Sequence, residues 1–256
     1  MVLDALESEI QMAFLSLLLI GTLVGIFVIS MGGGGGAIYL GILTGIFQLP
    51  ASVAASTSLI TAIPSLLLGV YVYYRQGKIN FKIGNKMLLI ALPSVLVGSL
   101  IAPHIPKVLY TFIISIILIV LGVQILFKNN KRSHQAVGHN NNSQIAFYGS
   151  LSGVMVGIAG LSGGGPIVAG LLLMGLDMVN AAATSSYVLI GTSILGALLH
   201  VSNSPIAWTE GIGLMLGALL GAFLGPHLMQ RFNKSAIWLP YVMGILLISM
   251  GLKTLI

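Results

Sequence analysis

Two clusters of glycine carry the most specific chemical signal in this sequence. The first covers residues 32–36, five glycines in succession, and the second covers 160–166, which reads Gly-Leu-Ser-Gly-Gly-Gly-Pro. Glycine costs about 1 kcal/mol relative to alanine inside a helix, so each cluster predicts a helix break, with Pro166 as the first residue of a new helix. A helix start offers unpaired N–H groups and a positive dipole end, so two converging starts would bind an anion without a buried Lys or Arg. Close helix packing is the alternative explanation for the glycines.

Two runs of hydroxyl side chains are placed to complete such a site. One run covers residues 56–58 and the other covers residues 184–186. Their hydroxyl groups can donate hydrogen bonds to sulfonate, sulfite or carboxylate oxygens. The alternative is that they bond to carbonyl groups of their own helix or of a neighbouring helix. The predicted substrate-binding residues are Gly34, Gly35, Gly36, Ala37, Ser56, Thr57, Ser58, Ser162, Gly163, Gly164, Gly165, Thr184, Ser185 and Ser186.

Titratable side chains are few outside the first residues. Asp177 precedes a predicted helix and is expected to be its N-cap, and Glu210 is expected at a solvated helix start. His104 and His227 occupy equivalent Pro-His positions near helix ends, where anchoring or capping is expected, as for His200. Proton coupling through a histidine stays open, because the ordinary pKa of histidine suits it. No cofactor and no metal are expected, and the absence of cysteine excludes cysteine metal sites.

The elements that must hold these residues are membrane-spanning helices. Only 6% of residues are charged, 57% are hydrophobic, and the mean hydropathy is +1.05. A soluble domain carries roughly a quarter charged residues, so a soluble fold is excluded. Several apolar blocks approach the ~20 residues of a spanning helix, and their lack of alternation favours helices over a membrane barrel. The blocks cover residues 12–31, 86–103, 108–127 and 236–255.

The chain contains an internal repeat. A shift of 128 residues places Gly21 on Gly149, Gly32 on Gly160, and the Ala-Ala-hydroxyl run at 54–58 on its counterpart. Each half has a long apolar segment, a glycine cluster, a short apolar piece and three full-length segments. The short pieces, 37–48 and 166–176, are too short to span. The full-length segments are 53–73, 86–103 and 108–127, then 180–200, 210–229 and 236–255. The predicted units are a first repeat at 1–127, a cytoplasmic linker at 128–144 and a second repeat at 145–256.

The predicted fold class is an all-α polytopic membrane protein with two inverted repeats, each a glycine-broken helical hairpin followed by three transmembrane helices. Five elements per half, an odd number, invert one half relative to the other. This topology places nine of the eleven basic residues on one side, the cytoplasmic one, and the acidic N-terminus outside. A rival topology of eight plain spans places eight basic residues inside and three outside. The acidic start is unlike a secretory signal, so residue 1 is expected to begin the mature protein.

With these residues in view, the chain resembles the sulfite exporter TauE/SafE family of membrane permeases. The resemblance rests on GGGGGAIYLGILTGIFQLPASVAASTSLITAIPSLLLGVYVYYRQGKI (32–79) and on GVMVGIAGLSGGGPIVAGLLLMGLDMVNAAATSS (153–186). It covers nearly the whole chain. It implies alternating-access transport of sulfite, organosulfonates or related anions, by export or by uptake, across the inner (plasma) membrane. A proton or a sodium ion is the candidate coupling ion, a homo-oligomer stays open, and no nucleic-acid partner is expected.

Other functions compete with this interpretation. Gly160, Leu161, Ser162 and Gly163 match the G-x-S-G pattern of rhomboid proteases, with His200 or His227 as the base. Ser162 lies in a duplicated glycine cluster where its counterpart is Gly34, so backbone shape explains the site better and no enzyme is expected. A passive anion channel is the other alternative, and it would need a continuous pore without saturable exchange. A purely structural membrane subunit is disfavoured, because a broken helix is costly without a cavity to line.

Overall fold

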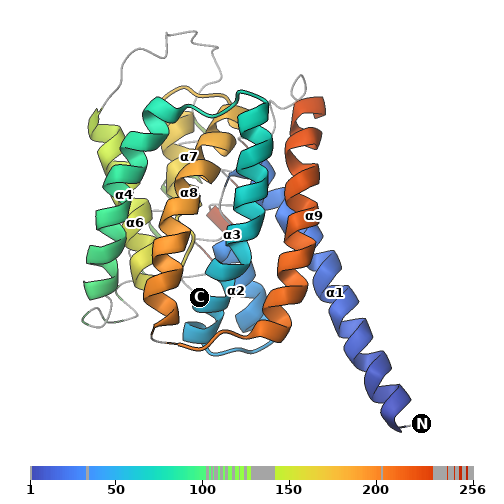
Figure 1. Cartoon of the computed structure of the whole chain (residues 1–256). Helices are drawn as coiled ribbons and strands as arrows, with labels where there is room; N and C mark the ends of the chain where they lie inside the picture. Colours follow the sequence, from blue (N-terminus) through green and yellow to red (C-terminus); the bar gives the residue numbers. More distant parts are fainter. Residues whose placement is uncertain are drawn as a thin grey trace.

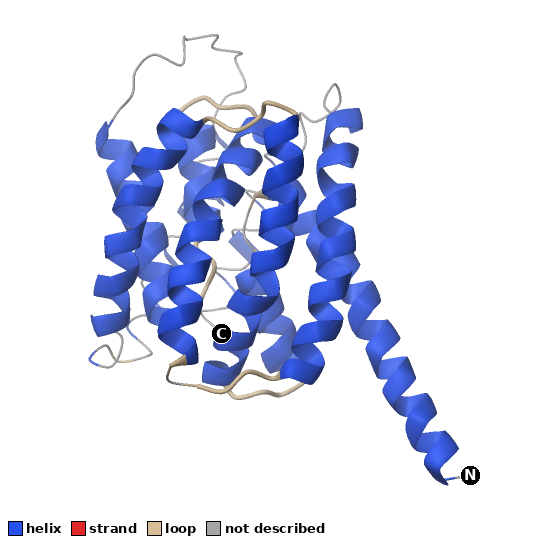
Figure 2. Ribbon diagram, viewed as in Figure 1, coloured by secondary structure: helices blue, strands red, loops and turns tan. Residues whose placement is uncertain are grey.

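The computed structural model describes residues 2–32, 35–101, 142–202 and 204–232, with isolated positions between 104 and 127 and between 241 and 252. The elements within these ranges are all helices, as the sequence predicts (Figures 1 and 2). The eight helices are α1 (Val2–Met31), α2 (Gly36–Gly45), α3 (Ala51–Arg75), α4 (Phe81–Ile101), α6 (Asn142–Ala159), α7 (Gly164–Leu173), α8 (Met178–Val201) and α9 (Trp208–Phe232).

Four of these helices are long and apolar enough to cross a membrane. They contain the segments Ser52–Arg75, Phe81–Ile101, Met178–Val201 and Trp208–Leu228. Large apolar side chains point outward, and Leu89 and Leu100 are 71% and 74% exposed, whereas hydroxyl side chains lie in the interior. A water-soluble protein shows the reverse distribution, so this outer surface fits lipid.

Both glycine clusters break their helices, as predicted. The first break lies between Met31 and Gly36, and the second lies between Ala159 and Gly164. Gly32, Gly160 and Gly163 have φ values of +62°, +64° and +59°, a region that side chains other than glycine rarely adopt. Pro166 is the third residue of α7 and not the first, so its predicted place is wrong by two positions. It still lies in the first turn, where a missing N–H breaks no helical hydrogen bond.

Close packing accounts for several glycines outside the clusters. Helix α1 packs along α9, and α6 packs along α4. A Cβ atom on Gly25 of α1 would lie 2.6 Å from the carbonyl oxygen of Ala218, and one on Gly98 of α4 would lie 2.8 Å from that of Val154. Small residues at these positions let the two backbones approach each other, which stabilises helix pairs in a membrane.

The described basic side chains gather at one end of the bundle. Helix α3 ends there, and α4, α6 and α8 begin there (Figure 1). The Nζ atom of Lys86 donates to Asn142 Oδ1 at 3.0 Å, which joins the starts of α4 and α6. We call this end the basic end. Its described Lys and Arg side chains are Arg75, Lys78, Lys82 and Lys86.

Parts of the predicted plan lie outside the described residues. The predicted linker covers 128–144, and its last three residues, 142–144, form the first turn of α6. The remaining linker residues, 128–141, lie outside the described part of the chain. The third span of each half, 108–127 and 236–255, is described only at isolated positions.

Candidate functional site

The two glycine breaks come into contact inside the bundle. A Cβ atom on Gly36 would lie 2.9 Å from the backbone nitrogen of Ser162 and 2.8 Å from its Cβ. Gly36 is the first residue of α2, and Ser162 lies two residues before α7. Both residues are buried. The breaks of the two halves, 126 residues apart in the sequence, therefore form one structural feature.

The starts of the two short helices have no side-chain cap. Gly35 is the N-cap of α2 and Gly163 is the N-cap of α7, and neither position has a capping hydrogen bond from a side chain. First-turn N–H groups have no partner within a helix, and each helix start carries roughly half a positive charge. Gly35, Gly36, Gly163 and Gly164 are buried, so this polarity is directed into the interior. Gly34 and the side chain of Ala37 lie outside the described residues.

Each hydroxyl run lies beside the break of the other half. A Cβ atom on Gly32 would lie 2.8 Å from the carbonyl oxygen of Ala182 in α8, and one on Gly160 would lie 2.7 Å from the Cβ of Ala55 in α3. The Oγ atom of Ser185 also donates to the carbonyl oxygen of Gly32 at 2.6 Å. The glycine cluster and the hydroxyl run that meet in space therefore come from different halves of the sequence.

The first hydroxyl run is satisfied by its own helix. Ser56, Thr57 and Ser58 each donate to a carbonyl oxygen three or four residues earlier, at 2.7–3.1 Å. This is the local bonding that the sequence left open as an alternative. In this conformation their hydroxyl hydrogens are engaged, so an anion would have to displace these bonds.

The second hydroxyl run has a free hydroxyl group. Ser186 is fully buried, and its Oγ atom has no hydrogen-bond partner in the structure. Three other buried hydroxyl groups share this property: those of Tyr39, Ser152 and Ser193. Buried polar atoms normally have a partner, so these four groups are candidates for binding water or a ligand. The sequence analysis missed Tyr39, Ser152 and Ser193, although a hydroxyl group inside an apolar segment is a signal that could have found them.

Two threonines accept hydrogen bonds from backbone N–H groups of the other half of the chain, in each case from the residue just before a long helix. Thr184 Oγ1 accepts from the N–H of Asn80, which directly precedes α4, at 3.0 Å. Thr57 Oγ1 accepts from the N–H of Ala207, which directly precedes α9, at 3.0 Å. The first bond lies toward the basic end, where α4 and α8 begin, and the second lies toward the opposite end, where α3 and α9 begin (Figure 1). We call these two bonds the threonine contacts.

The titratable side chains take structural positions. Asp177 is the N-cap of α8, as predicted, and it accepts from the backbone N–H of Asn180 at 3.4 Å and from its side-chain amide. Glu210 lies in the first turn of α9. The Nε2 atom of His200 lies 3.2 Å from the carbonyl oxygen of Val156, and the Nδ1 atom of His227 lies 2.7 Å from that of Phe223. His104 is exposed, and the part of the chain around it is described only at isolated positions.

Known proteins match this chain over nearly its whole length. The family described as "Sulfite exporter TauE/SafE" matches residues 17–254. The probable membrane transporter protein YdhB of Bacillus subtilis is 27% identical, over 91% of this chain and 99% of its own length. YunE of the same organism, also described as a probable membrane transporter protein, is 23% identical over 94% of this chain and 96% of its own length. A probable membrane transporter protein of Haemophilus influenzae is 23% identical over 90% of each chain.

These matches also decide the question of enzymatic activity. The family and the relatives are described as exporters or transporters, so the chain is not an enzyme, and Ser162 is not a protease nucleophile. The two histidines considered as its base face backbone carbonyl groups. Four long apolar helices and the transporter relatives make the chain a multi-pass membrane protein. The chain belongs to the sulfite exporter TauE/SafE family of membrane transporters.

Proposed function

We propose that this protein transports small sulfur-containing anions, such as sulfite or organosulfonates, by alternating access, with the anion bound where the two broken helices meet. The observation that carries the proposal is the contact between Gly36 and Ser162, which brings two uncapped helix starts together in the interior. The family description, which names sulfite, supports the choice of anion.

The proposed site holds the anion by hydrogen bonds and dipoles. The donors are the first-turn N–H groups of α2 and α7, together with the hydroxyl of Ser186. The described Lys and Arg side chains lie at the basic end and not at the breaks. A site without a buried cation lacks the attraction of a full positive charge at close range, so it binds an anion less tightly. Such weak, multi-point binding suits a carrier, because the anion must also be released.

The proposed architecture is a pair of inverted repeats, 1–127 and 145–256, joined by a linker in the cytoplasm. The pairing of α1 with α9 and of α6 with α4 supports it, because α1 is equivalent to α6 and α9 to α4, so the two pairs are equivalent and each joins one half to the other. The threonine contacts support it too, because they are equivalent: one joins α8 to the residue before α4, and the other joins α3 to the residue before α9. The basic end would face the cytoplasm, and the membrane would be the inner (plasma) membrane.

The threonine contacts support the proposal of alternating access. One contact joins the two halves at each end of the bundle, and α3 and α8, which carry the threonines, are the most buried of the four long helices. Opening either end would require its contact to break while the other stays closed. The anion site between them would thus be exposed to one side at a time.

Transport in liposomes tests the proposal directly. The purified protein would be reconstituted and assayed for uptake of labelled sulfite, sulfate, thiosulfate and small sulfonates, with imposed proton or sodium gradients. We expect saturable uptake of at least one sulfur anion, accelerated by the same anion on the opposite side. Uptake that does not saturate would indicate a passive channel. No flux of any of these anions under either gradient would overturn the choice of substrate.

A further inference from the structure

Two of the four buried hydroxyl groups without a partner lie at the starts of the short helices, one at each start. The four groups belong to Tyr39, Ser152, Ser186 and Ser193, and the two at the helix starts are those of Tyr39 and Ser152. Both of these side chains are fully buried. A buried hydroxyl group without a partner has lost its bonds to water, which costs free energy unless a water molecule or a ligand binds it.

Ser152, in α6, lies beside the start of α7. A Cβ atom on Gly163, the N-cap residue of α7, would overlap the Oγ atom of Ser152 and lie 2.6 Å from its carbonyl oxygen. Farther along α7, a Cβ atom on Gly170 would overlap the ring of Tyr148, which lies one turn before Ser152 in α6. Helix α6 is therefore packed tightly along α7, and this packing holds the Ser152 hydroxyl at the helix start.

The Ser152 hydroxyl does not use the acceptor that its own helix offers. Hydroxyl groups elsewhere in these helices donate to the carbonyl oxygen four residues earlier, as Thr22 and Ser94 do at 2.8 Å and 2.9 Å. The equivalent acceptor for Ser152 is the carbonyl oxygen of Tyr148, and this bond is not formed. The hydrogen of the Ser152 hydroxyl is therefore available to a ligand at the start of α7.

Tyr39 brings a hydroxyl group to the start of α2. A Cβ atom on Gly35, the N-cap residue of α2, would overlap the Cδ2 and Cε2 atoms of the Tyr39 ring, so the ring lies back over the helix start. The hydroxyl group is attached to the ring carbon next to Cε2. The Ser65 hydroxyl lies near it, but donates its own hydrogen to the carbonyl oxygen of Ala62 at 2.8 Å. The Tyr39 hydroxyl is thus held beside the start of α2 without a hydrogen-bond partner.

The internal repeat does not relate these two hydroxyl groups to each other. A shift of 128 residues places Tyr39 on Ile167 and Ser152 on Val24. The hydroxyl at the start of α2 comes from α2 itself, whereas the one at the start of α7 comes from the preceding helix, α6. An interaction inherited through the repeat would use equivalent positions, so this recurrence favours a ligand that is shared by both starts.

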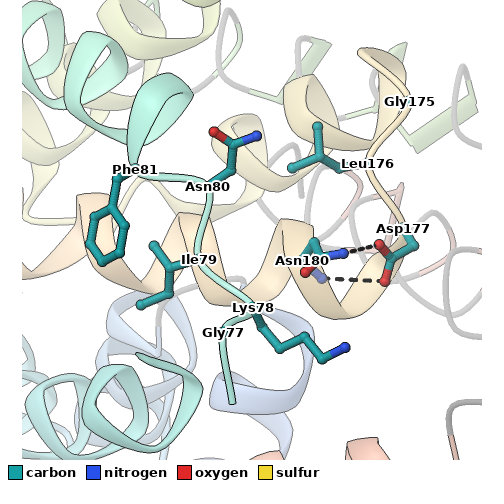
Figure 3. Close-up of a pocket in the computed structure, with 9 residues that line it drawn as sticks. All are labelled: Gly77, Lys78, Ile79, Asn80, Phe81, Gly175, Leu176, Asp177 and Asn180. Atoms are coloured by element: carbon teal, nitrogen blue, oxygen red, sulfur yellow. Dashed lines mark hydrogen bonds between the residues drawn. The ribbon is translucent and has the colours of Figure 1, made fainter. Parts of the chain in front are cut away.

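A pocket of about 410 Å³ at the basic end has a different lining (Figure 3). One wall is formed by residues 77–81 and the other by residues 175–177 and 180, so the walls come from the two halves of the sequence. Lys78 and Asp177 both line it, and their opposite charges leave the lining without a net charge. None of the four unpartnered hydroxyl groups lines this pocket. Further ligands of an anion are therefore expected at the glycine breaks.

We propose that the hydroxyl groups of Tyr39 and Ser152 are ligands of the transported oxyanion, one at each helix start, and that each donates a hydrogen bond to an oxygen of the anion. The identity of the anion rests on the proposed function, whereas the positions of the two hydroxyl groups rest on the contacts around Gly35 and Gly163. Each hydroxyl adds one donor to the N–H groups of its helix start.

Variants that remove only these hydroxyl groups test the inference. Thermal unfolding in detergent would be measured at increasing concentrations of sulfite and of methanesulfonate. Tyr39→Phe and Ser152→Ala should not lower the melting temperature without anion, because neither hydroxyl has a partner. Each variant should raise the anion concentration for half-maximal stabilisation at least about threefold, as expected for the loss of one hydrogen bond. The double variant should raise it further.

The matched controls remove hydroxyl groups that have partners. Tyr73→Phe makes the same chemical change at a fully buried tyrosine, whose hydroxyl donates to the carbonyl oxygen of Ile29 at 3.0 Å. This control should lower the melting temperature and leave the anion dependence unchanged. Ser94→Ala removes a hydroxyl that bonds within α4, and it should also leave the anion dependence unchanged. If Tyr39→Phe and Ser152→Ala leave the anion dependence as these controls do, the inference is wrong.

The outcomes separate this inference from the proposed function. If liposomes take up sulfite or sulfonates but both variants bind the anion as the natural protein does, the hydroxyl ligands are overturned while the proposed transport stands. If no sulfur anion is bound or transported, but phosphate or acetate stabilises the protein through Tyr39 and Ser152, the hydroxyl ligands stand while the proposed substrate is overturned. If none of these anions shifts the melting temperature of the natural protein, the inference is overturned.

Discussion

At the scale of the residue, the proposed anion site depends on which glycines pack directly against the backbone of another helix or loop. Gly36 and Gly41 lie in the same short helix, α2, but have different surroundings. A Cβ atom on Gly36 would press on the backbone of Ser162, whereas one on Gly41 would meet nothing within 4 Å. The glycines of this helix are therefore not equivalent, although they are only five residues apart.

This difference gives a matched pair of variants. Gly36→Ala should abolish or strongly reduce anion uptake, because the added methyl group must separate the two helix starts. Gly41→Ala should leave uptake unchanged, and its helix should be slightly more stable, since alanine is favoured over glycine by about 1 kcal/mol within helices. The measurement is initial uptake per folded protein in liposomes. Equal uptake by the two variants would mean that the contact of the breaks is not part of the site.

The hydroxyl runs give a second prediction at this scale. Ser186→Ala should weaken apparent anion affinity several-fold, as expected for a hydrogen bond worth about 0.5–1.5 kcal/mol. It should not lower the melting temperature, because the Ser186 hydroxyl has no partner in the structure. Ser58→Ala should affect affinity less, because that hydroxyl already bonds to the carbonyl of Ala55. Binding would be measured by the anion dependence of thermal stability in detergent.

A larger loss of affinity in Ser58→Ala than in Ser186→Ala would contradict this assignment. It would show that the bonds of the first run rearrange in the bound state. Arg75→Ala serves as a further control, because Arg75 is exposed at the basic end. Its loss is expected to change the rate of uptake or the topology but not the equilibrium affinity.

At the scale of the element, α3 and α8 connect the site to the two ends of the bundle. Each helix carries a hydroxyl run that begins within its first two turns, and each run lies beside the break of the other half. Each helix also carries one threonine contact, to Ala207 or to Asn80. A shift of either helix would therefore change both the surroundings of a break and the closure of one end.

The threonine contacts predict opposite effects of two equivalent substitutions. Thr184→Val removes the acceptor for Asn80 and should favour the state that is open at the basic end. Thr57→Val removes the acceptor for Ala207 and should favour the state that is open at the opposite end. Both bonds are partly buried, and leaving a buried N–H group without a partner costs about 1–3 kcal/mol, enough to change the populations of two states severalfold or more.

A single Cys at position 186 would report these states through its reaction with a membrane-impermeant maleimide added to either side. Thr184→Val should raise the rate from the basic-end side, and Thr57→Val should raise it from the other side. Thr44→Val is the control, because Thr44 bonds only within its own short helix. If both test variants raise the rate from the same side, the contacts are not gates at opposite ends.

At the scale of the whole molecule, the distribution of charge relates the bundle to the membrane. The described Lys and Arg side chains lie at the basic end, whereas α1 begins at the opposite end, where its first residues project from the bundle (Figure 1). Cytoplasmic loops carry an excess of Lys and Arg. The arrangement thus favours a cytoplasmic basic end and an N-terminus on the outer side.

Cysteine labelling in intact cells tests this orientation. Cysteines at positions 80 and 135 should be protected from an impermeant reagent, and a cysteine at position 5 should react with it. The physical reason is that the loop before α4 lies at the basic end, and that the predicted linker is rich in Lys and Arg, which favour the cytoplasmic side. Labelling of position 5 only after the membrane is permeabilised would contradict the hairpin topology and favour eight plain spans.

The sequence by itself predicted the features that depend on neighbouring residues: the long helices, their breaks and one helix cap. Apolar length predicted the long helices, and the two glycine clusters predicted the breaks, because the cost of glycine in a helix is a property of the residue itself. The cap formed by Asp177 followed for the same reason, since a carboxylate before a helix start bonds to N–H groups within three residues. The motifs around the breaks also predicted the family.

Only the tertiary structure decided which of these local features meet. The sequence could not show that Gly32 packs on Ala182 and Gly160 on Ala55, because such contacts depend on how helices more than 100 residues apart are packed. It could not separate Ser58, which is satisfied by its own helix, from Ser186, which is not, since both occupy equivalent places in the repeat. The pocket beside Lys78 has the same origin. Its walls belong to two loops that are distant in the chain and that only the packed bundle brings together.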